Sequence, residues 1–228
     1  MTREIKVVQR VLAVNERMAE ENRRRFAAKG IFVLNVMSSP GSGKTTTLHK
    51  TIERLMPGTR TAVIVGDIAT THDADRLAVT GAPVVQVNTD AFGGDCHLEP
   101  HVIEKAADDL DLDAIDLLIV ENVGNLVCPS SYDLGEDAKI VLLSTTEGED
   151  KPLKYPSIFF KSELMLLTKI DLLPYVPFKA ELARENARRI HPGMEIIDVS
   201  SITGEGLDRW MEWLRTREAK AKPAAAGA

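Results

Sequence analysis

The chain has 228 residues, 44% of them hydrophobic and 27% charged, and its formal net charge is -6 at pH 7. This balance is typical of one sizeable globular domain with extensions. No basic block is long enough for a nucleic-acid footprint, and no apolar stretch approaches the ~20 residues of a membrane span, so neither partner is expected. The N-terminal residues lack the apolar core of a signal peptide, which favours a cytoplasmic protein.

The pattern of residues 1–28 predicts an N-terminal helix, clearest over residues 3–27. Apolar side chains recur there every seven positions, at Ile5, Leu12, Ala19 and Phe26. Charged residues fill most other positions, as in an amphipathic helix. Asn15 and Asn22 interrupt the apolar stripe. We expect this helix to pack on the main domain, and a contact between two copies of the chain is the alternative.

Short apolar runs alternate with helical patterns over residues 29–217, which we expect to form the main domain. The predicted strands are residues 31–37, 61–66, 84–87, 117–121, 139–144, 163–168 and 195–199. The predicted helices lie near residues 43–56, 73–80, 98–109, 178–190 and 206–217. Strands that are apolar on both faces and alternate with helices indicate an α/β fold, with a mostly parallel seven-stranded sheet flanked by helices. Residues 218–228 are expected to be a disordered tail, because their composition cannot bury apolar area.

A glycine-containing loop directly follows the first predicted strand. Residues 38–45 read Ser-Ser-Pro-Gly-Ser-Gly-Lys-Thr. The start of the next helix exposes unpaired N–H groups and a positive partial charge, which suit a polyphosphate. Lys44 can reach the outer phosphates, so the loop predicts a P-loop NTPase, although Ser38 stands where the motif has its first Gly. The residues expected to bind the nucleotide here are Gly41, Ser42, Gly43, Lys44, Thr45 and Thr46.

Two acidic residues end predicted strands beside this loop. Asp67 ends the second strand and Glu121 the fourth. Carboxylates in this place are natural Mg²⁺ partners, so we expect Thr45, Asp67 and Glu121 to bind magnesium. Gly124 follows Glu121 as in a GTPase switch, where the Gly N–H senses the γ-phosphate. We expect Lys44, Asp67, Glu121 and Gly124 to act in hydrolysis, and acids that only cap loops are the alternative.

The segment Thr-Lys-Ile-Asp after the sixth predicted strand resembles the Asn-Lys-x-Asp guanine motif. Asp171 can accept hydrogen bonds from guanine N1–H and the exocyclic amine, donors that adenine does not offer as a pair. The Lys169 stem can cover the face of the base. Ser200 and Ser201 begin a later loop expected on the same side. Thr168 departs from the motif, because Asn there normally ties this loop to the phosphate loop. Together these segments favour GTP and GDP over ATP.

Cys96 and Cys128 are the only cysteines in the sequence. A structural disulfide is not expected in a reducing compartment, so metal binding, redox chemistry and simple burial remain. His97 adjoins Cys96, and thiolates with an imidazole suit Zn²⁺ and Ni²⁺. These three residues are one ligand short of a tetrahedral structural site, which two copies of the chain related by a twofold axis could complete.

At these segments the chain resembles a known family, the HypB-type GTPases that incorporate nickel into hydrogenases. The resemblance covers essentially residues 3–217. Its most specific parts are Glu-Asn-Val-Gly-Asn-Leu-Val-Cys-Pro at residues 121–129 and Thr-Glu-Gly-Glu-Asp-Lys-Pro-Leu-Lys-Tyr-Pro at residues 146–156. The phosphate loop, Gly-Asp-Ile at 66–68, Cys-His at 96–97 and Lys-Ile-Asp at 169–171 complete it. The urease-maturation cousins carry Cys-Pro-His, which does not occur here.

The resemblance implies that Cys96, His97 and Cys128 form a metal site at a homodimer interface that GTP promotes. It implies that the chain hydrolyses GTP with Mg²⁺ and delivers Ni²⁺, while Zn²⁺ can occupy the same site. The implied partners are a HypA-type zinc/nickel metallochaperone and the precursor of the hydrogenase large subunit.

No catalytic Gln or Arg stands out in the sequence, so we expect slow hydrolysis of GTP. GTP is expected to order residues 121–129 and so to couple Gly124 to Cys128. Lys151 and Lys154 either reach across the dimer or lie on a solvated loop. The rival functions are an ATP-dependent small-molecule kinase, a metal carrier with negligible catalysis, and a maturation GTPase for urease or a cobalamin enzyme.

Overall fold

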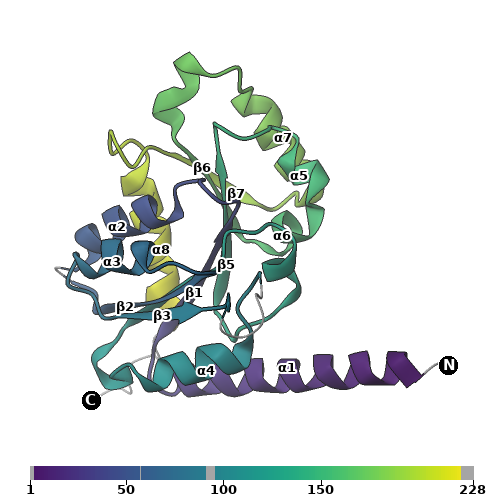
Figure 1. The fold of residues 1–228 in the computed structure, drawn as a ribbon. Coiled ribbons are helices and arrows are strands. Elements are labelled where there is room, and N and C mark those ends of the chain that lie inside the picture. The colour runs from purple at the N-terminus through teal and green to yellow at the C-terminus, as the bar shows by residue number, and fades with distance from the viewer. Residues whose placement is uncertain (1–2, 57, 91–95, 222–228) are drawn as a thin grey trace.

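A parallel sheet forms the centre of the molecule. The computed structural model describes the backbone of residues 3–56, 58–90 and 96–221, and the side chains within these ranges from residue 13 onward. The seven strands lie in the order β3-β2-β4-β1-β5-β6-β7 (Figure 1). A mostly parallel sheet was expected, and every neighbouring pair of strands is in fact parallel. The strands are β1 (Phe32–Ser38), β2 (Thr61–Asp67), β3 (Val84–Asn88), β4 (Leu117–Glu121), β5 (Ala138–Ser144), β6 (Leu164–Thr168) and β7 (Glu195–Val199). Each predicted strand is present, with its ends shifted by one residue at most.

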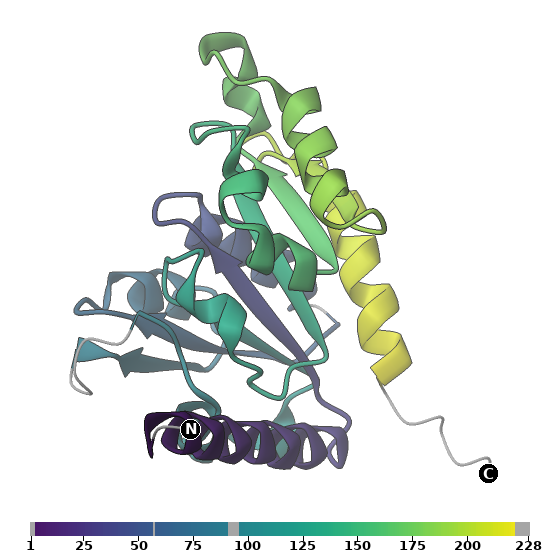
Figure 2. The same ribbon diagram turned by 90° about the vertical axis from the view of Figure 1, so that its right-hand side faces the viewer.

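Helices cover both faces of this sheet (Figures 1 and 2). One face carries α2 (Lys44–Leu55), α3 (His72–Ala78) and α8 (Leu207–Ala221). The other carries α1 (Arg3–Ala27), α4 (Pro100–Asp108), α5 (Lys151–Lys154), α6 (Pro156–Lys161) and α7 (Ala180–Ile190). The sequence did not predict α5 and α6, because four and six residues are too few for a helical period to be visible.

The last helix continues past the boundary expected at residue 217, as far as Ala221. Glu218 is buried in its last turns and accepts a hydrogen bond from Thr59 Oγ1 (3.2 Å). This anchor holds the first residues of the segment that was expected to be disordered. Residues 222–228 of that segment lie outside the described residues.

The N-terminal helix α1 lies beside α4 at the bottom of Figure 1, and its N-terminal half extends past the sheet. Ala19 and Phe26 are buried against the domain. Asn22 is also buried, and its amide donates to the carbonyl oxygens of Pro100 (2.8 Å) and Leu134 (3.1 Å). Asn22 interrupts the apolar stripe in the sequence but not the packed face of the helix, because satisfied hydrogen bonds make its burial possible.

The parallel sheet gathers polar strand ends at one edge. Five strands end there in Ser38, Asp67, Glu121, Ser144 and Thr168. Ligands of parallel α/β sheets bind beyond such carboxyl ends. The fold therefore brings the residues singled out in the sequence to a common edge.

Candidate nucleotide pocket and metal centre

A cavity of about 430 Å³ lies beyond the carboxyl ends of β1, β2 and β4. The loop between β1 and α2 forms one wall. Gly41 and Gly43 have φ angles of 73° and 94°, left-handed values that cost glycine little and other residues more. These turns let the loop curl in front of α2, so that Gly41, Gly43, Lys44, Thr45 and Thr46 all line the cavity.

Lys44 is mostly buried within this loop. Its ammonium donates to the Ser38 hydroxyl (3.0 Å). Burial lowers the pKa of Lys44, because desolvation disfavours the charged form, while the carboxylate of Glu121 acts in the opposite direction. Ser38, which departs from the motif, thus gives a buried cation a polar partner. The phosphates of a nucleotide would add negative charge beside this cation.

Ser42 shapes the loop from beneath. Its side chain is buried, and its hydroxyl donates to the Ser39 carbonyl oxygen (2.9 Å). The Ser42 carbonyl oxygen in turn accepts from Thr168 Oγ1 (2.7 Å). This bond provides the tie between guanine loop and phosphate loop that the missing Asn was expected to make. The departure at Thr168 therefore leaves the two loops joined.

Glu121 is buried at the end of β4, facing Thr45. Its Oε1 accepts from Thr45 Oγ1 (2.8 Å), while within the described part of the chain its Oε2 has no hydrogen-bond partner. Burial raises the pKa of Glu121 to about 7, although the charge of Lys44 opposes this. A buried carboxylate oxygen without a partner, next to a hydroxyl, fits a hard cation such as Mg²⁺.

Asp67 lines the same cavity from the end of β2. Its Oδ1 accepts from the Ile68 N–H (2.6 Å), and its Oδ2 accepts from the Thr70 hydroxyl. These bonds orient the carboxylate within its own turn. Both acids predicted to bind magnesium therefore face one cavity, although they come from different strands.

Gly124 packs directly against the phosphate loop. A Cβ atom at this position would come within 3.1 Å of Pro40 Cα, a backbone atom that cannot easily move aside. The close approach therefore favours glycine, since a side chain here would push the loop back by a few tenths of an ångström. It also places Gly124 among the residues that line the cavity.

The side expected to bind guanine is formed by the loop after β6. Lys169 has a φ of 58°, and its Nζ donates to the Gly41 carbonyl oxygen (2.7 Å), so its stem lies along the cavity wall. Asp171 Oδ1 is buried and has no hydrogen-bond partner among the described residues. An unpaired carboxylate oxygen of this kind suits the N–H donors of guanine.

Ser200 and Ser201 stabilise the last loop. Ser200 Oγ accepts from the N–H groups of Ile202 (3.2 Å) and Thr203 (3.1 Å). The hydroxyl of Ser201 lies 3.0 Å from Thr47 Oγ1 on α2. These side chains hold the loop in place beside α2.

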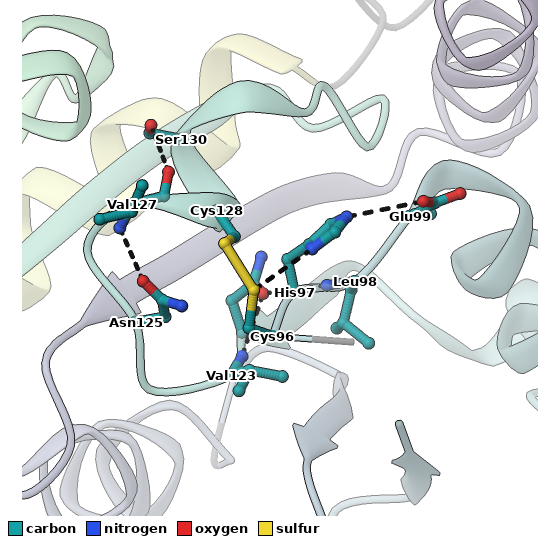
Figure 3. Close-up of a disulfide and its surroundings, with 10 residues drawn as sticks. Cys96, His97, Leu98, Glu99, Val123, Asn125, Val127, Cys128 and Ser130 are labelled. Atoms are coloured by element: carbon teal, nitrogen blue, oxygen red, sulfur yellow. Dashed lines mark hydrogen bonds and ion pairs between the residues drawn. A yellow bond between two sulfur atoms is a disulfide. The ribbon is translucent and has the colours of Figure 1, made fainter. Parts of the chain in front are cut away.

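Cys96 and Cys128 lie side by side in a second cluster (Figure 3). Their Cα atoms are 6.2 Å apart and the structure joins their sulfur atoms in a disulfide. This contradicts the expectation that no disulfide forms. The reason is geometric, since the fold brings two loops within the Cα separation that a disulfide spans. Thiolates are the metal-binding form of cysteine, so this cluster can bind metal only after reduction.

His97 completes this cluster. Cys96, His97 and Cys128 each offer one ligand atom, and these three atoms all lie within 4.8 Å of one another. The His97 ring stacks on Tyr132 with centroids 4.1 Å apart, and its Nε2 lies 3.6 Å from Glu99 Oε1. Its Nδ1 lies 3.9 Å from Cys96 Sγ. His97 Nε2 has no hydrogen-bond partner among the described residues, so the observed contact that orients the ring is its stacking on Tyr132.

Comparison with known proteins places this geometry in a family. A family profile described as "CobW/HypB/UreG, nucleotide-binding domain" matches residues 32–198. The chain is 54% identical over 207 residues to the hydrogenase maturation factor HypB of Escherichia coli, covering 91% of this chain and 70% of that protein. The chain belongs to the HypB group of the CobW/HypB/UreG family.

Other members resemble it along most of their length. The hydrogenase/urease maturation factor HypB of Helicobacter pylori is 40% identical over 216 residues, covering 93% of this chain and 87% of that protein. A crystal structure of HypB from Helicobacter pylori in complex with nickel has a TM-score of 0.85 at 38% identity, and the match covers 94% of this chain and 99% of that chain. The predicted family, P-loop α/β fold and GTPase class are thereby confirmed. Across the described part of the chain, no helix has the length and apolarity to cross a membrane.

Several cavity residues were missed in the sequence. Asp73 and Arg76 reach the cavity from α3, and Arg76 Nη2 donates to Thr46 Oγ1 (2.8 Å). They follow the strand that ends in Asp67, and this position was the signal that could have found them. Asn122 also lines the cavity, directly after Glu121. Asn122 belongs to the family motif at residues 121–129, but the sequence indicated no separate role for it.

Proposed function

We propose that this chain is a GTP-hydrolysing metallochaperone that delivers nickel during maturation of nickel–iron hydrogenase. The observation that carries the proposal is the closeness of two sites along the chain. Glu121 lines the nucleotide cavity, and the same segment reaches Cys128 of the metal cluster after seven residues. The names of the relatives, maturation factors and a nickel complex, support this assignment.

The proposed reaction is the hydrolysis of GTP to GDP and phosphate. Lys44 and the N-terminus of α2 would hold the phosphates and stabilise the charge that builds on the transferred group. Thr45, Asp67 and Glu121 would hold Mg²⁺, whose charge further neutralises the phosphate oxygens when it is bound. Asp171 would select guanine, because adenine leaves its buried oxygen unpaired.

The proposed cargo site is the reduced form of Cys96, His97 and Cys128. Two thiolates and an imidazole bind Ni²⁺ and also Zn²⁺. The cytoplasm, where thiols are kept reduced, is the proposed location. Three ligands leave the coordination incomplete, so we propose that GTP promotes a homodimer in which a second copy completes it.

Nucleotide and metal would act on each other through residues 121–129. GTP would hold Gly124 against the phosphate loop, and hydrolysis would release it and loosen the ligand Cys128. Nickel would then pass to the hydrogenase large-subunit precursor. A HypA-type zinc/nickel metallochaperone is the proposed second partner of this transfer.

A second candidate function is the maturation of urease. One relative, the Helicobacter pylori protein, carries both hydrogenase and urease in its name. The two functions share the GTPase and the metal cluster, and they differ in the recipient protein. A pull-down with hydrogenase precursor and with urease apoprotein, each with GTP and nickel, separates them by which recipient is captured.

Sedimentation velocity of the reduced protein tests the proposed function. The samples contain GDP or a non-hydrolysable GTP analogue, with and without nickel. We expect dimers with the GTP analogue and nickel, and monomers with GDP. Monomers under all four conditions would contradict the proposal, and a parallel assay of phosphate release from GTP distinguishes an enzyme from a passive carrier.

A further inference from the structure

Asn122 stands between the two sites. It follows Glu121 at the end of β4, its side chain is 1% exposed, and it lines the nucleotide cavity. Its backbone N–H donates to the Val36 carbonyl oxygen (3.0 Å), so the residue extends the pairing of β4 with β1. The position of its side chain is therefore fixed by the most buried part of the sheet.

The side-chain oxygen of Asn122 binds two loops at once. Asn122 Oδ1 accepts from the N–H of Val123 (3.0 Å) and from the N–H of Leu98 (3.3 Å). Leu98 directly follows His97, and Val123 directly precedes Gly124. One oxygen atom thus joins the loop with two metal ligands to the segment that leads from the nucleotide to the third ligand.

The amide end of the same side chain is anchored in the core. Asn122 Nδ2 donates to Asn35 Oδ1 (3.2 Å), and Asn35 Nδ2 donates to Glu136 Oε1 (3.1 Å). Asn35 is fully buried in β1, whose last residue begins the phosphate loop. A buried donor or acceptor left without its partner is unfavourable, so this chain of bonds resists rearrangement.

Leu98 is held from a second direction. A Cβ atom added at Gly66 would lie 2.9 Å from the Leu98 side chain, so Leu98 packs directly on the end of β2. Gly66 immediately precedes Asp67 in the nucleotide cavity. The residue after the metal ligands therefore rests on both strand ends that carry the acidic nucleotide residues.

We infer that Asn122 is the positioning residue that transmits the state of the nucleotide to Cys96 and His97. A displacement of Gly124 moves Val123, and Val123 shares its acceptor oxygen with Leu98. The loop of Cys96 and His97 then shifts together with Cys128, so all three ligands respond to one event. This inference rests on the proposed function, because it names the side chain through which the two sites are coupled.

Nickel affinity measured with each nucleotide tests this inference. The reduced protein is titrated with Ni²⁺ alone as the probe, in GDP and in a non-hydrolysable GTP analogue. The ratio of the two dissociation constants is the coupling factor, expected to be about 10 for the parent chain. We expect Asn122→Ala to reduce this factor to below about 2. Because the factor is the ratio of two affinities of the same variant, an equal change of nickel affinity in both nucleotide states leaves it unchanged.

Two further variants separate coupling from folding. Asn122→Asp keeps the acceptor oxygen for Leu98 and Val123 but removes the donor to Asn35, so it should keep part of the coupling. Asn125→Ala is the matched control, because among the described residues Asn125 Oδ1 accepts a hydrogen bond from the Val127 N–H (2.7 Å) of its own loop alone. It should leave the factor unchanged. Thermal unfolding of each variant shows whether the fold is kept.

The outcomes are distinct. A parent chain whose nickel affinity is the same with both nucleotides contradicts the proposed function, and this inference with it. A parent chain that shows coupling, with Asn122→Ala folded and equally coupled, contradicts this inference alone. If Asn122→Ala does not fold, a factor in Asn122→Asp equal to that of Asn125→Ala would likewise overturn it.

Discussion

The nucleotide pocket and the metal cluster share an edge of the sheet, but they are built differently. The phosphate-binding wall of the pocket is one continuous loop that leads into α2, and strand ends, α3 and the loop after β6 complete the cavity. The metal cluster joins two loops whose cysteines are 32 residues apart in sequence. Because a site made by two loops changes when either loop moves, the cluster is the part of the molecule that can be switched. The pocket binds the nucleotide and so sets which state the cluster adopts.

The largest expected effect is the loss of nickel binding when one proposed ligand is removed, while GTP binding is kept. Cys128→Ala in the reduced protein should weaken nickel binding by more than about 100-fold, since even outer-shell partners of a metal are worth about 10–100-fold. GTP binding to the monomer should stay near that of the parent, because Cys128 does not line the nucleotide cavity. Parallel titrations with nickel and with GTP measure both. Ser130→Ala, in the same short helix, is the control, and equal nickel binding in both variants would refute the ligand assignment.

Oxidation should abolish nickel binding and leave nucleotide binding intact, without any mutation. With the disulfide between Cys96 and Cys128 formed, nickel binding should be lost, and a phosphine reductant should restore it. Nucleotide affinity should not change, because neither sulfur contacts the pocket. Nickel titration of the oxidised and the reduced protein, with thiols counted in each sample, measures this effect. An oxidised protein that binds nickel as the reduced one does would show that the thiolates are not ligands.

A change at Asp171 should affect only the pocket. Asp171→Asn should weaken GTP binding by roughly 100-fold, because hydrogen bonds to a charged group are worth about 1.5–3 kcal/mol each. Binding of xanthosine triphosphate should improve, since an amide can donate to the additional base oxygen. Competition between the two nucleotides measures the change. Unchanged preference for GTP would mean that this carboxylate does not contact the base.

The smallest expected effect is a pH dependence of the free energy of unfolding. Only the protein without bound nucleotide and magnesium should show it. The pKa of Glu121 is raised to about 7 by burial, so the folded protein binds this proton more tightly than the unfolded chain does. The contribution of Glu121 to the free energy of unfolding is therefore fully present at low pH. It is lost as pH rises from about 4.5 through 7. Between pH 5 and 7.5 the loss from this group should be about 2 kcal/mol, since one pH unit corresponds to about 1.4 kcal/mol.

Denaturant unfolding at a series of pH values measures this dependence. Glu121→Gln should flatten it, because the amide does not titrate. Magnesium and GTP should flatten it in the parent chain, since a cation beside the carboxylate keeps it ionised. The same slope in parent and variant would show that Glu121 does not titrate in this range.

The sequence predicted the residues that carry each site better than the contacts that hold them in place. Gly41, Gly43 and Lys44 form a local motif, and local backbone geometry follows from such residues. Strand ends such as Asp67 and Glu121 were found because parallel strands bring their ends together. By contrast, the hydrogen bonds of Asn122 and the stacking of His97 on Tyr132 depend on contacts between segments distant in the sequence, which no local pattern predicts.

The pairing of the two cysteines was not expected for a related reason. Cysteine chemistry was inferred from the compartment, whereas the pairing of Cys96 with Cys128 depends on the distance between two loops. Asn22 illustrates the same limit in the N-terminal helix. A polar residue in an apolar stripe suggests an interruption until its partners on other segments are known.

The central claim is that nucleotide and nickel sites are energetically coupled, and reciprocity tests it most directly. The affinity of the reduced protein for a non-hydrolysable GTP analogue is measured with and without saturating nickel. Linkage requires that nickel strengthen nucleotide binding by the same factor by which the analogue strengthens nickel binding, about 10-fold in this account. An affinity for the analogue that nickel leaves unchanged would contradict it.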